Sequence, residues 1–330
     1  MSSKKIIAII GATGTQGSSV AKTFLGHSSH WHVRCITRNT SSAAAQALSE
    51  QGAEVVTADL SDPASLLRAF EGAHVIFVNT DFWTTYVALL GTKSFEEACK
   101  IGYETEVRHA RNAAEAAARI PTLERYVYSA LGPMKRTSNG RYASTHWETK
   151  AATVDHIEEN MPDLAAKTSY IYISVYATNA FLLPKANKAE PSGPYNYIVN
   201  CSPSTIFPII DTANSTGPFV HALINEPPRT RLLAYDSSMT VGEVVKTWER
   251  VTGKQAKFEQ LSTEQMLERT PSSIEVMRAP AFIDEFGYMG GIENWISPDK
   301  LQQKPQTPSY EEFLGKQSSE HLLNAQFPPL

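Results

Sequence analysis

The sequence is poor in the features of secreted, membrane and nucleic-acid-binding proteins. Its only cysteines, Cys35, Cys99 and Cys201, are far apart and lack metal-ligand spacing, so we expect neither a disulfide framework nor a metal site. No apolar run approaches the length of a membrane span, and no signal-peptide pattern is visible. The net charge of −4 gives no electrostatic reason to bind nucleic acid. We therefore expect a cytoplasmic protein with no nucleic-acid or membrane partner.

What the chain does contain is the composition of an ordinary globular protein. Hydrophobic residues make up 42% of its 330 residues, and this length can hold one large α/β domain and a smaller one.

A glycine-rich turn near the start organises the larger domain. It follows the apolar β-branched run 6–10 and precedes the run 18–25, which has helical spacing; it reads Gly11-Ala12-Thr13-Gly14-Thr15-Gln16-Gly17. We expect Gly11 to permit a tight turn, Gly14 to let a pyrophosphate approach the backbone, and Gly17 to let helix and strand pack closely. The free N–H groups of the helix then face the phosphates. We favour this nucleotide-binding interpretation over a plain strand–helix turn.

Strands and helices alternate at short spacing beyond this turn. Further strands are expected at 31–37, 54–57, 74–78, 124–129 and 169–175. Between them, helices are expected at 42–50, 63–70, 95–119 and 146–159. This order is typical of a Rossmann-type doubly wound parallel sheet in the α/β class.

The composition changes after the last of these strands. Proline and glycine become frequent between Pro184 and Pro208, which indicates that the chain leaves the sheet. We therefore predict a Rossmann domain that binds the nucleotide at 1–175 and a smaller α/β substrate-binding domain at 176–330, with part of 200–225 returning to the sheet. Helices are expected at 211–225, 240–251, 263–269 and 273–286, and a last one after Ser309.

The residues after the second strand indicate which nicotinamide cofactor is preferred. Arg38 lies about 20 residues beyond the glycine turn, where an NAD enzyme carries an acidic residue for the ribose 2′-hydroxyl. A guanidinium with nearby hydroxyls suits a 2′-phosphate instead, so we predict NADP(H); the alternative is that Arg38 is a solvated loop charge. Asp59 and Leu60, after the third strand, are expected beside the adenine.

A catalytic motif opens the helix predicted at 146–159. Short-chain dehydrogenases carry Tyr-x-x-x-Lys there, and this spacing puts both side chains on one helix face. Here Lys150 matches, and His146 stands at the tyrosine position. Histidine can donate a proton near neutral pH; the alternative is a polar helix residue without a catalytic role. Ser129, at the end of the preceding strand, and Tyr142, one turn before His146, complete the catalytic candidates.

Aromatic residues are expected to line a substrate pocket. Those that follow strands at the carboxyl edge of the sheet lie where ligands bind in such folds; the alternative is that they only cover that edge. The substrate-binding candidates are Phe82, Trp83, Tyr86, Trp147 and Phe181, with Tyr176 beside them. Asp81 or Glu104 would be the acid or base of a non-redox reaction, although surface solvation is the simpler role for both.

Together these motifs resemble the NmrA-like family of atypical short-chain dehydrogenase relatives, many of them fungal. The resemblance rests on the glycine turn, on Arg38, on 146–151, on Asn179 and on 241–248. It implies a Rossmann domain, a smaller C-terminal domain and NADP in the cleft between them. The cofactor-binding residues expected from the motifs and the resemblance are Gly11, Thr13, Gly14, Thr15, Gln16, Gly17, Arg38, Asp59, Leu60, Thr80, Lys150, Tyr176 and Asn179.

Three functions are consistent with the resemblance. The first is an NADPH-dependent reductase of the carbonyl or imine group of a hydrophobic small molecule, in fungal secondary metabolism. The second is a redox sensor or transcriptional co-regulator that binds NADP and a regulatory protein partner without turnover. The third is a cyclase that keeps NADP(H) in its site without net redox. The aromatic candidates favour the first.

Overall fold

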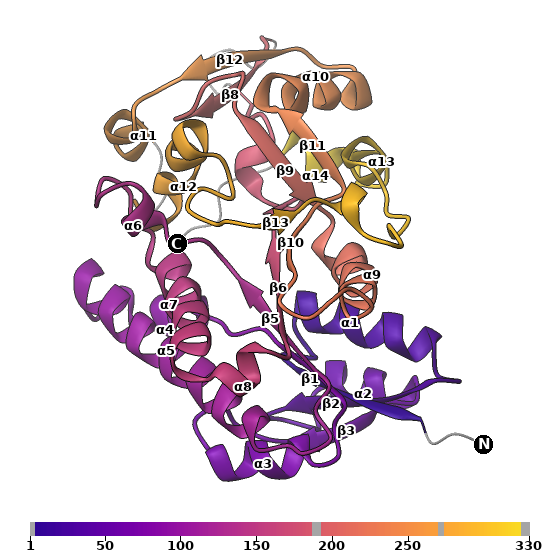
Figure 1. Cartoon of the computed structure of the whole chain (residues 1–330). Coiled ribbons are helices and arrows are strands. Elements are labelled where there is room, and N and C mark those ends of the chain that lie inside the picture. Colours follow the sequence, from indigo (N-terminus) through magenta and orange to yellow (C-terminus); the bar gives the residue numbers. More distant parts are fainter. Residues whose placement is uncertain (1–3, 187–192, 270–273, 325–330) are drawn as a thin grey trace.

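A parallel sheet of eight strands forms the centre of the molecule (Figure 1). The structure, a computed structural model, describes residues 4–186, 193–269 and 274–324. The strand order is β13-β10-β6-β5-β4-β1-β2-β3, and each neighbouring pair is parallel. The bounds are β1 (Lys5–Ile10), β2 (Trp31–Thr37), β3 (Glu54–Thr57), β4 (Val75–Val78), β5 (Arg125–Ala130), β6 (Thr168–Ile173), β10 (Arg231–Ala234) and β13 (Trp295–Ile296).

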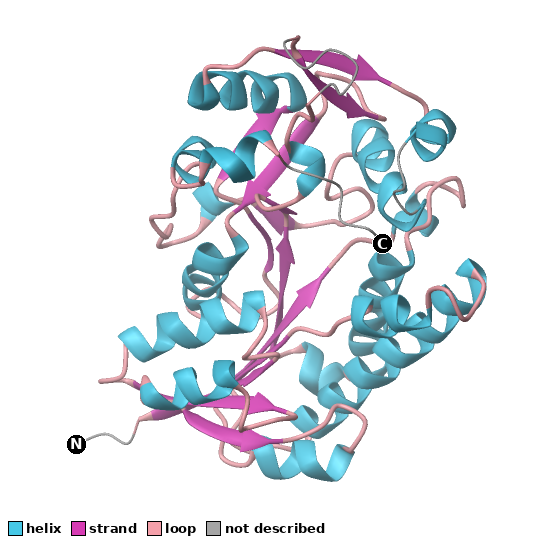
Figure 2. Cartoon of the chain, turned by 180° about the vertical axis from the view of Figure 1, so that it is seen from behind, coloured by secondary structure: helices cyan, strands magenta, loops and turns pink. Residues whose placement is uncertain are grey.

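Helices cover both faces of this sheet, as Figure 2 shows from behind. Because successive side chains of a buried strand point to opposite faces, Ile7 and Ile9 pack on one side and Ala8 and Ile10 on the other. The first face carries α1 (Thr15–Gly26), α2 (Ala43–Glu50) and α9 (Thr212–Leu223), and the second carries α3 (Pro63–Phe70), α5 (Phe95–Ala118), α7 (Thr145–Asn160) and α8 (Pro162–Ala165). This arrangement confirms the predicted Rossmann-type fold.

Two smaller sheets and several short helices make up the upper half of Figure 1. The three-stranded sheet contains β7 (Val175–Tyr176), β9 (Ile206–Ile210) and β11 (Ser237–Thr240), and β8 (Tyr195–Val199) pairs with β12 (Ala256–Gln260). The remaining helices are α4 (Trp83–Leu89), α6 (Met134–Thr137), α10 (Val241–Thr252), α11 (Thr263–Arg269), α12 (Ile274–Phe286), α13 (Tyr310–Gly315) and α14 (Ser319–Leu323), with 3-10 turns η1 (Ala180–Leu182) and η2 (Pro298–Lys300). No helix within the described ranges is long and apolar enough to cross a bilayer.

The chain crosses between the two halves more than once. The single strand expected at 169–175 is divided, because β6 ends at Ile173 and β7 belongs to the smaller sheet. Within 200–225, β9 also joins the smaller sheet, whereas α9 packs on the larger one. The strand that returns to the central sheet is the later β10, whose last three residues are buried and apolar. The domain boundary at 175 stays a prediction.

Local signals in the sequence explain where several helices begin. Asp62 caps α3 and is followed by proline at the first helical position, which suits both the free N–H groups and the fixed φ of proline. Capping boxes open three further helices: Ser94 with Glu97 for α5, Thr240 with Glu243 for α10, and Ser309 with Glu312 for α13.

Helices α1 and α9 approach so closely at Gly217 that no larger residue fits. A Cβ atom on Gly217 would lie 2.2 Å from both the carbonyl oxygen of Ser19 and the hydroxyl of Thr23. We expect Gly217→Ala to lower the free energy of unfolding by about 2–3 kcal/mol, because the two helices would have to separate. Gly26→Ala at the end of α1, where a Cβ would meet nothing within 4 Å, is the matched control and should cost nothing. Urea unfolding of the three proteins measures the difference; equal stability of both variants would contradict this packing.

Candidate active site

A large cavity opens at the carboxyl ends of β1, β4, β5 and β6. Its volume is about 960 Å³, near the upper end of the range of ligand pockets, about 300–1,000 Å³. Helix α12 and the η1 turn close the cavity on the side away from the sheet. This is the edge where parallel sheets bind ligands, so the fold places the candidate site where the sequence predicted it.

The glycine turn forms one end of this cavity. Its lining residues are Gly11, Thr13, Gly14, Thr15 and Gln16. Gly11 has φ +72°, a left-handed conformation that favours glycine, and a Cβ on Gly17 would lie 2.1 Å from the carbonyl oxygen of Gly11. The predicted roles of these two glycines, in turning the chain and in close packing, therefore agree with the geometry. Gly17 itself does not line the cavity.

Gln16 has an unused hydrogen-bonding atom at this end of the cavity. The side chain is 5% exposed, and its Nε2 donates to the hydroxyl of Tyr176 at 2.7 Å. Its Oε1 is buried without a hydrogen-bond partner among the described residues. Because buried polar atoms are nearly always hydrogen-bonded, this oxygen indicates that a ligand donor belongs here. The glycine cradle and this atom fit a dinucleotide.

Arg38 lies at the same end of the cavity, with Asp59 and Leu60. Its guanidinium makes no hydrogen bond or ion pair with any residue that the structure describes, so its donors are available to a phosphate. The carboxylate of Asp59 accepts hydrogen bonds from the side chain and the backbone of Ser61. These bonds, with a smaller contribution from the charge of Arg38, lower the pKa of Asp59. The adjacent lining residue His109 was not predicted.

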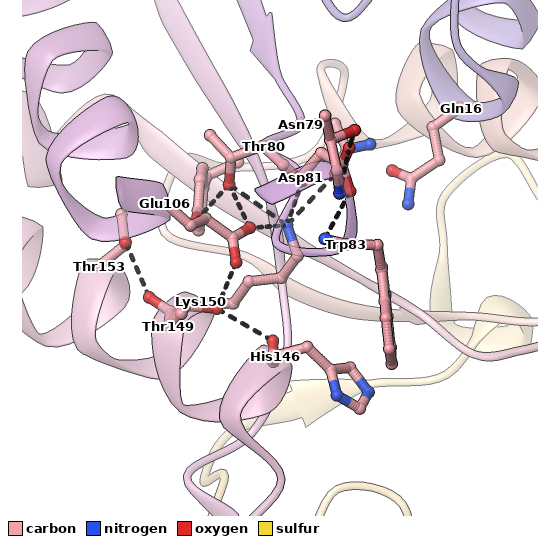
Figure 3. Close-up of polar contacts among 12 residues, drawn as sticks. Gln16, Asn79, Thr80, Asp81, Trp83, Glu106, His146, Thr149, Lys150 and Thr153 are labelled. Carbon is pink, nitrogen blue, oxygen red and sulfur yellow. Dashed lines mark hydrogen bonds and ion pairs between the residues drawn. The ribbon is translucent and has the colours of Figure 1, made fainter. Parts of the chain in front are cut away.

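Lys150 lies at the middle of the cavity, tethered from several sides (Figure 3). Its Nζ is 3.3 Å from Glu106 Oε1, 3.0 Å from the carbonyl oxygen of Thr80 and 3.3 Å from Asn79 Oδ1. Burial alone would favour the neutral amine, but the Glu106 carboxylate outweighs it and raises the pKa of Lys150. The side chain is therefore a fixed cation that faces the cavity.

Glu106 anchors this arrangement from helix α5. Its side chain is fully buried, and its oxygens accept from Thr80 Oγ1 at 2.7 Å and from Thr149 Oγ1 at 2.5 Å, in addition to contacting Lys150. Glu106 was not among the residues predicted from the sequence. The sequence did contain a signal for Glu106, because this acidic residue lies on the same apolar helix face as Ala110 and Ala113. A charge on a buried face needs a partner.

His146, one helical turn before Lys150, is paired with a second buried carboxylate that the sequence did not reveal. Its ring Nδ1 is 2.7 Å from Glu275 Oε1, and its backbone N–H donates to the same oxygen at 2.7 Å. Burial would raise the pKa of Glu275, but the hydrogen bonds and charge of His146 lower it below its ordinary value. Because the partners are 129 positions apart in the sequence, no local pattern could have found the pair.

The predicted aromatic residues divide into those that line the cavity and those that support it. Phe82, Trp83, Trp147, Tyr176 and Phe181 line it, as do the predicted Thr80, Ser129 and Asn179. Tyr86 is buried and stacks on Phe82 with the ring centroids 5.2 Å apart, so it supports Phe82 from behind. Tyr142 packs against Phe282 and Phe286 and does not line the cavity.

The two acidic candidates for non-redox chemistry have other partners. Asp81 lines the cavity, but its carboxylate accepts from the backbone N–H groups of Trp83 and Thr84 and so caps α4. Glu104 is exposed and 4.0 Å from Lys100, outside the cavity lining. Within the described ranges, no group of three or more potential metal ligands gathers.

A comparison with known protein families shows to which family the chain belongs. The model of the NmrA-like family matches residues 3–314. The chain belongs to the NmrA-like family. It is 29% identical over 288 residues to the NmrA-like oxidoreductase himF of Aspergillus japonicus, which covers 84% of this chain and 80% of the relative.

Two solved structures show the same fold as this NmrA-like protein. Leucoanthocyanidin reductase of Vitis vinifera, solved with NADPH, superposes with a TM-score of 0.70 at 13% identity, covering 94% of this chain and 98% of that one. NmrA, a negative transcriptional regulator solved with NADP, gives a TM-score of 0.64 at 17% identity, covering 99% and 96%. The fold therefore occurs in a protein named as an enzyme and in one named as a regulator, and the site must distinguish between these functions.

Proposed function

We propose that this NmrA-like protein is an NADP(H)-dependent oxidoreductase that reduces a carbonyl or imine carbon of a hydrophobic small molecule. The observation that carries the proposal is a single cavity with a dinucleotide cradle at one end, an aromatic wall at the other, and Lys150 and His146 between them. The oxidoreductase name of its relative himF and the NADPH bound to leucoanthocyanidin reductase support it.

Different residues of the cavity would bind different parts of the cofactor. The turn from Gly11 to Gln16 would hold the diphosphate against the N-terminus of α1, and Arg38 would hold the 2′-phosphate. Lys150, fixed by Glu106, would hold the nicotinamide ribose. When bound, the reduced cofactor supplies a hydride.

The other end of the cavity suits an apolar substrate. Phe82 and Trp83 form one wall, and Met277, Pro280 and Ile283 of α12 form part of the other. These side chains exclude water, which strengthens electrostatic interactions inside the site. His146 lies among them and would donate the proton that completes the reduction.

Turnover with a substrate panel tests this function. Purified protein is incubated with NADPH and with aldehydes, ketones and cyclic imines that carry an aromatic group, and nicotinamide absorbance and product are measured together. We expect one NADPH to be consumed for each reduced product. Product without NADPH consumption would overturn the proposal in favour of a cyclase. No turnover, together with a protein partner whose binding follows the NADP/NADPH ratio, would overturn it in favour of a sensor. Roles in secondary metabolism and in the cytoplasm stay predictions.

A further inference from the structure

We propose that Glu275 is the positioning residue of a His146–Glu275 pair that delivers the proton in the reduction. Glu275 would hold the imidazole by Nδ1, leave Nε2 facing the cavity, and stabilise the protonated ring with its negative charge. This inference rests on the proposed function, because it assigns the proton donor of that reaction, but the pair itself can be tested without any substrate.

The geometry of the pair fixes the ring in one orientation. A single oxygen, Glu275 Oε1, lies 2.7 Å from both the backbone nitrogen and the ring Nδ1 of His146. The backbone N–H must donate, so the oxygen is an acceptor, and a ring nitrogen that contacts it bonds best when it carries a proton. Glu275 is fully buried and the His146 side chain is 16% exposed. A hydrogen bond to a buried carboxylate such as that of Glu275 is stronger than one between two neutral groups.

The opposite side of the ring faces the part of the cavity that is lined by aromatic residues. The imidazole lies 4.8 Å from the ring of Trp83 and 6.3 Å from that of Phe82, between centroids, and Figure 3 shows it beside Trp83. No hydrogen bond links Nε2 to any residue in the described part of the chain. His146 itself lines the cavity. A substrate oxygen or nitrogen in the cavity can therefore reach Nε2.

The pair also joins the two walls of the cavity. His146 lies in the first turn of α7 on the sheet side, and Glu275 lies in the first turn of α12 on the opposite side. The next residues of α12, Val276 and Met277, line the cavity. A change in Glu275 is therefore expected to affect the proton donor and the substrate wall together.

The proposed reduction adds one hydride and one proton to the substrate, and the His146–Glu275 pair supplies the proton. The substrate carbon receives a hydride, the π electrons of the C=O or C=N bond move to the heteroatom, and that heteroatom takes the proton from Nε2. The ring is left neutral, with its remaining proton on Nδ1 and directed at Glu275, and solvent restores the second proton. A carboxylate behind a histidine acts in this way in other acid–base sites, by holding the tautomer and stabilising the imidazolium.

Glu275 could also have a purely structural role as a cap for the N-terminus of α7, and this role would explain part of the geometry. Ser144, the N-cap residue of α7, makes no side-chain capping bond, and Glu275 accepts from the backbone at that helix end. Glu275→Gln separates the two roles, because glutamine keeps a carbonyl oxygen as a cap but has no charge. Glu285→Gln is the matched control: it lies on the same helix and pairs with Arg141 on the surface.

The first measurement is nitrogen NMR of histidine-labelled protein without cofactor. We expect the neutral ring of His146, assigned by loss of its signal in His146→Gln, to carry its proton on Nδ1. In Glu275→Gln, loss of the negative charge should make the ring of His146 harder to protonate. The hydrogen-ion concentration at which half of the rings are protonated should be about tenfold higher than in the wild type. Cys99 lies 3.9 Å from Glu275, the charges of Arg278 and Glu96 act on Cys99, and Lys150 is one helical turn from His146. All four groups are unchanged in this comparison.

The second measurement is the pH dependence of kcat. In the wild type, kcat should fall as the pH rises and the ring of His146 loses its proton. In Glu275→Gln this fall should occur at lower pH. At pH about 8, kcat of the variant should therefore be roughly tenfold or more below that of the wild type. Glu285→Gln should match the wild type. A proton on Nε2 of the neutral ring, or a Glu275→Gln protein that melts earlier with unchanged ring titration and rate profile, would overturn the inference. If wild type reduces no substrate, the proposed function fails, and the NMR result still decides whether the pair exists.

Discussion

Replacement of Lys150 by methionine is expected to lower kcat/KM for reduction about 100-fold, because misplacing a bound reactant costs about that much. The same change removes the cation beside Glu106, whose carboxylate is fully buried. Breaking a buried ion pair from one side costs about 3–5 kcal/mol, so this variant should also be less stable. Initial rates and thermal unfolding together measure the two effects.

A double variant separates the two roles of Lys150. Lys150→Met with Glu106→Gln removes both charges, so we expect most of the lost stability to return while the rate stays low. Lys100→Met is the surface control, because Lys100 is exposed and 4.0 Å from the exposed Glu104. Wild-type rates in a well-folded double variant would show that Lys150 has only a structural role.

Substitution of Arg38 by alanine should remove most of the preference for NADPH over NADH. A hydrogen bond to a charged group contributes about 1.5–3 kcal/mol, so the variant should bind NADPH roughly 10- to 150-fold more weakly. The affinity for NADH should not change, because NADH has no 2′-phosphate. Fluorescence titration of the two reduced dinucleotides gives both dissociation constants.

Arg119→Ala is the control for this substitution. Arg119 is exposed and follows α5, where the chain approaches the amino end of β5, on the edge of the sheet opposite the cavity. Its replacement should leave both affinities unchanged. If Arg38→Ala weakened NADPH and NADH binding equally, Arg38 would not be a ligand of the 2′-phosphate.

The sequence predicted the larger half of the fold because its signals are local. Apolar runs, glycine turns and capping residues lie within a few positions of the elements that they define, as in the strand–turn–helix around Gly11. The same approach failed where the chain changes sheets. Ser174 separates β6 from β7, but nothing in the run 169–175 indicates that its last residues pair with β9, which lies about 30 positions further on.

In the candidate site too, residues with local sequence signals were predicted, and residues brought together only by the tertiary structure were not. Lys150 and His146 were found because their spacing follows the helical repeat, and Arg38 because its distance from the glycine turn is set by the fold. Their partners Glu106 and Glu275 come from other helices, so only the tertiary structure brings them together. Tyr142 was proposed on its proximity in sequence to His146, but its ring packs against α12 instead.

Calorimetric titration of the purified protein with NADPH, NADP and NADH tests the central claim most directly, because each assigned role depends on a dinucleotide in the cavity beside the glycine turn. We expect saturable binding at one site per chain, tighter for NADPH than for NADH. Absence of binding heat with all three dinucleotides over a range of temperatures, from protein that unfolds cooperatively, would contradict the account.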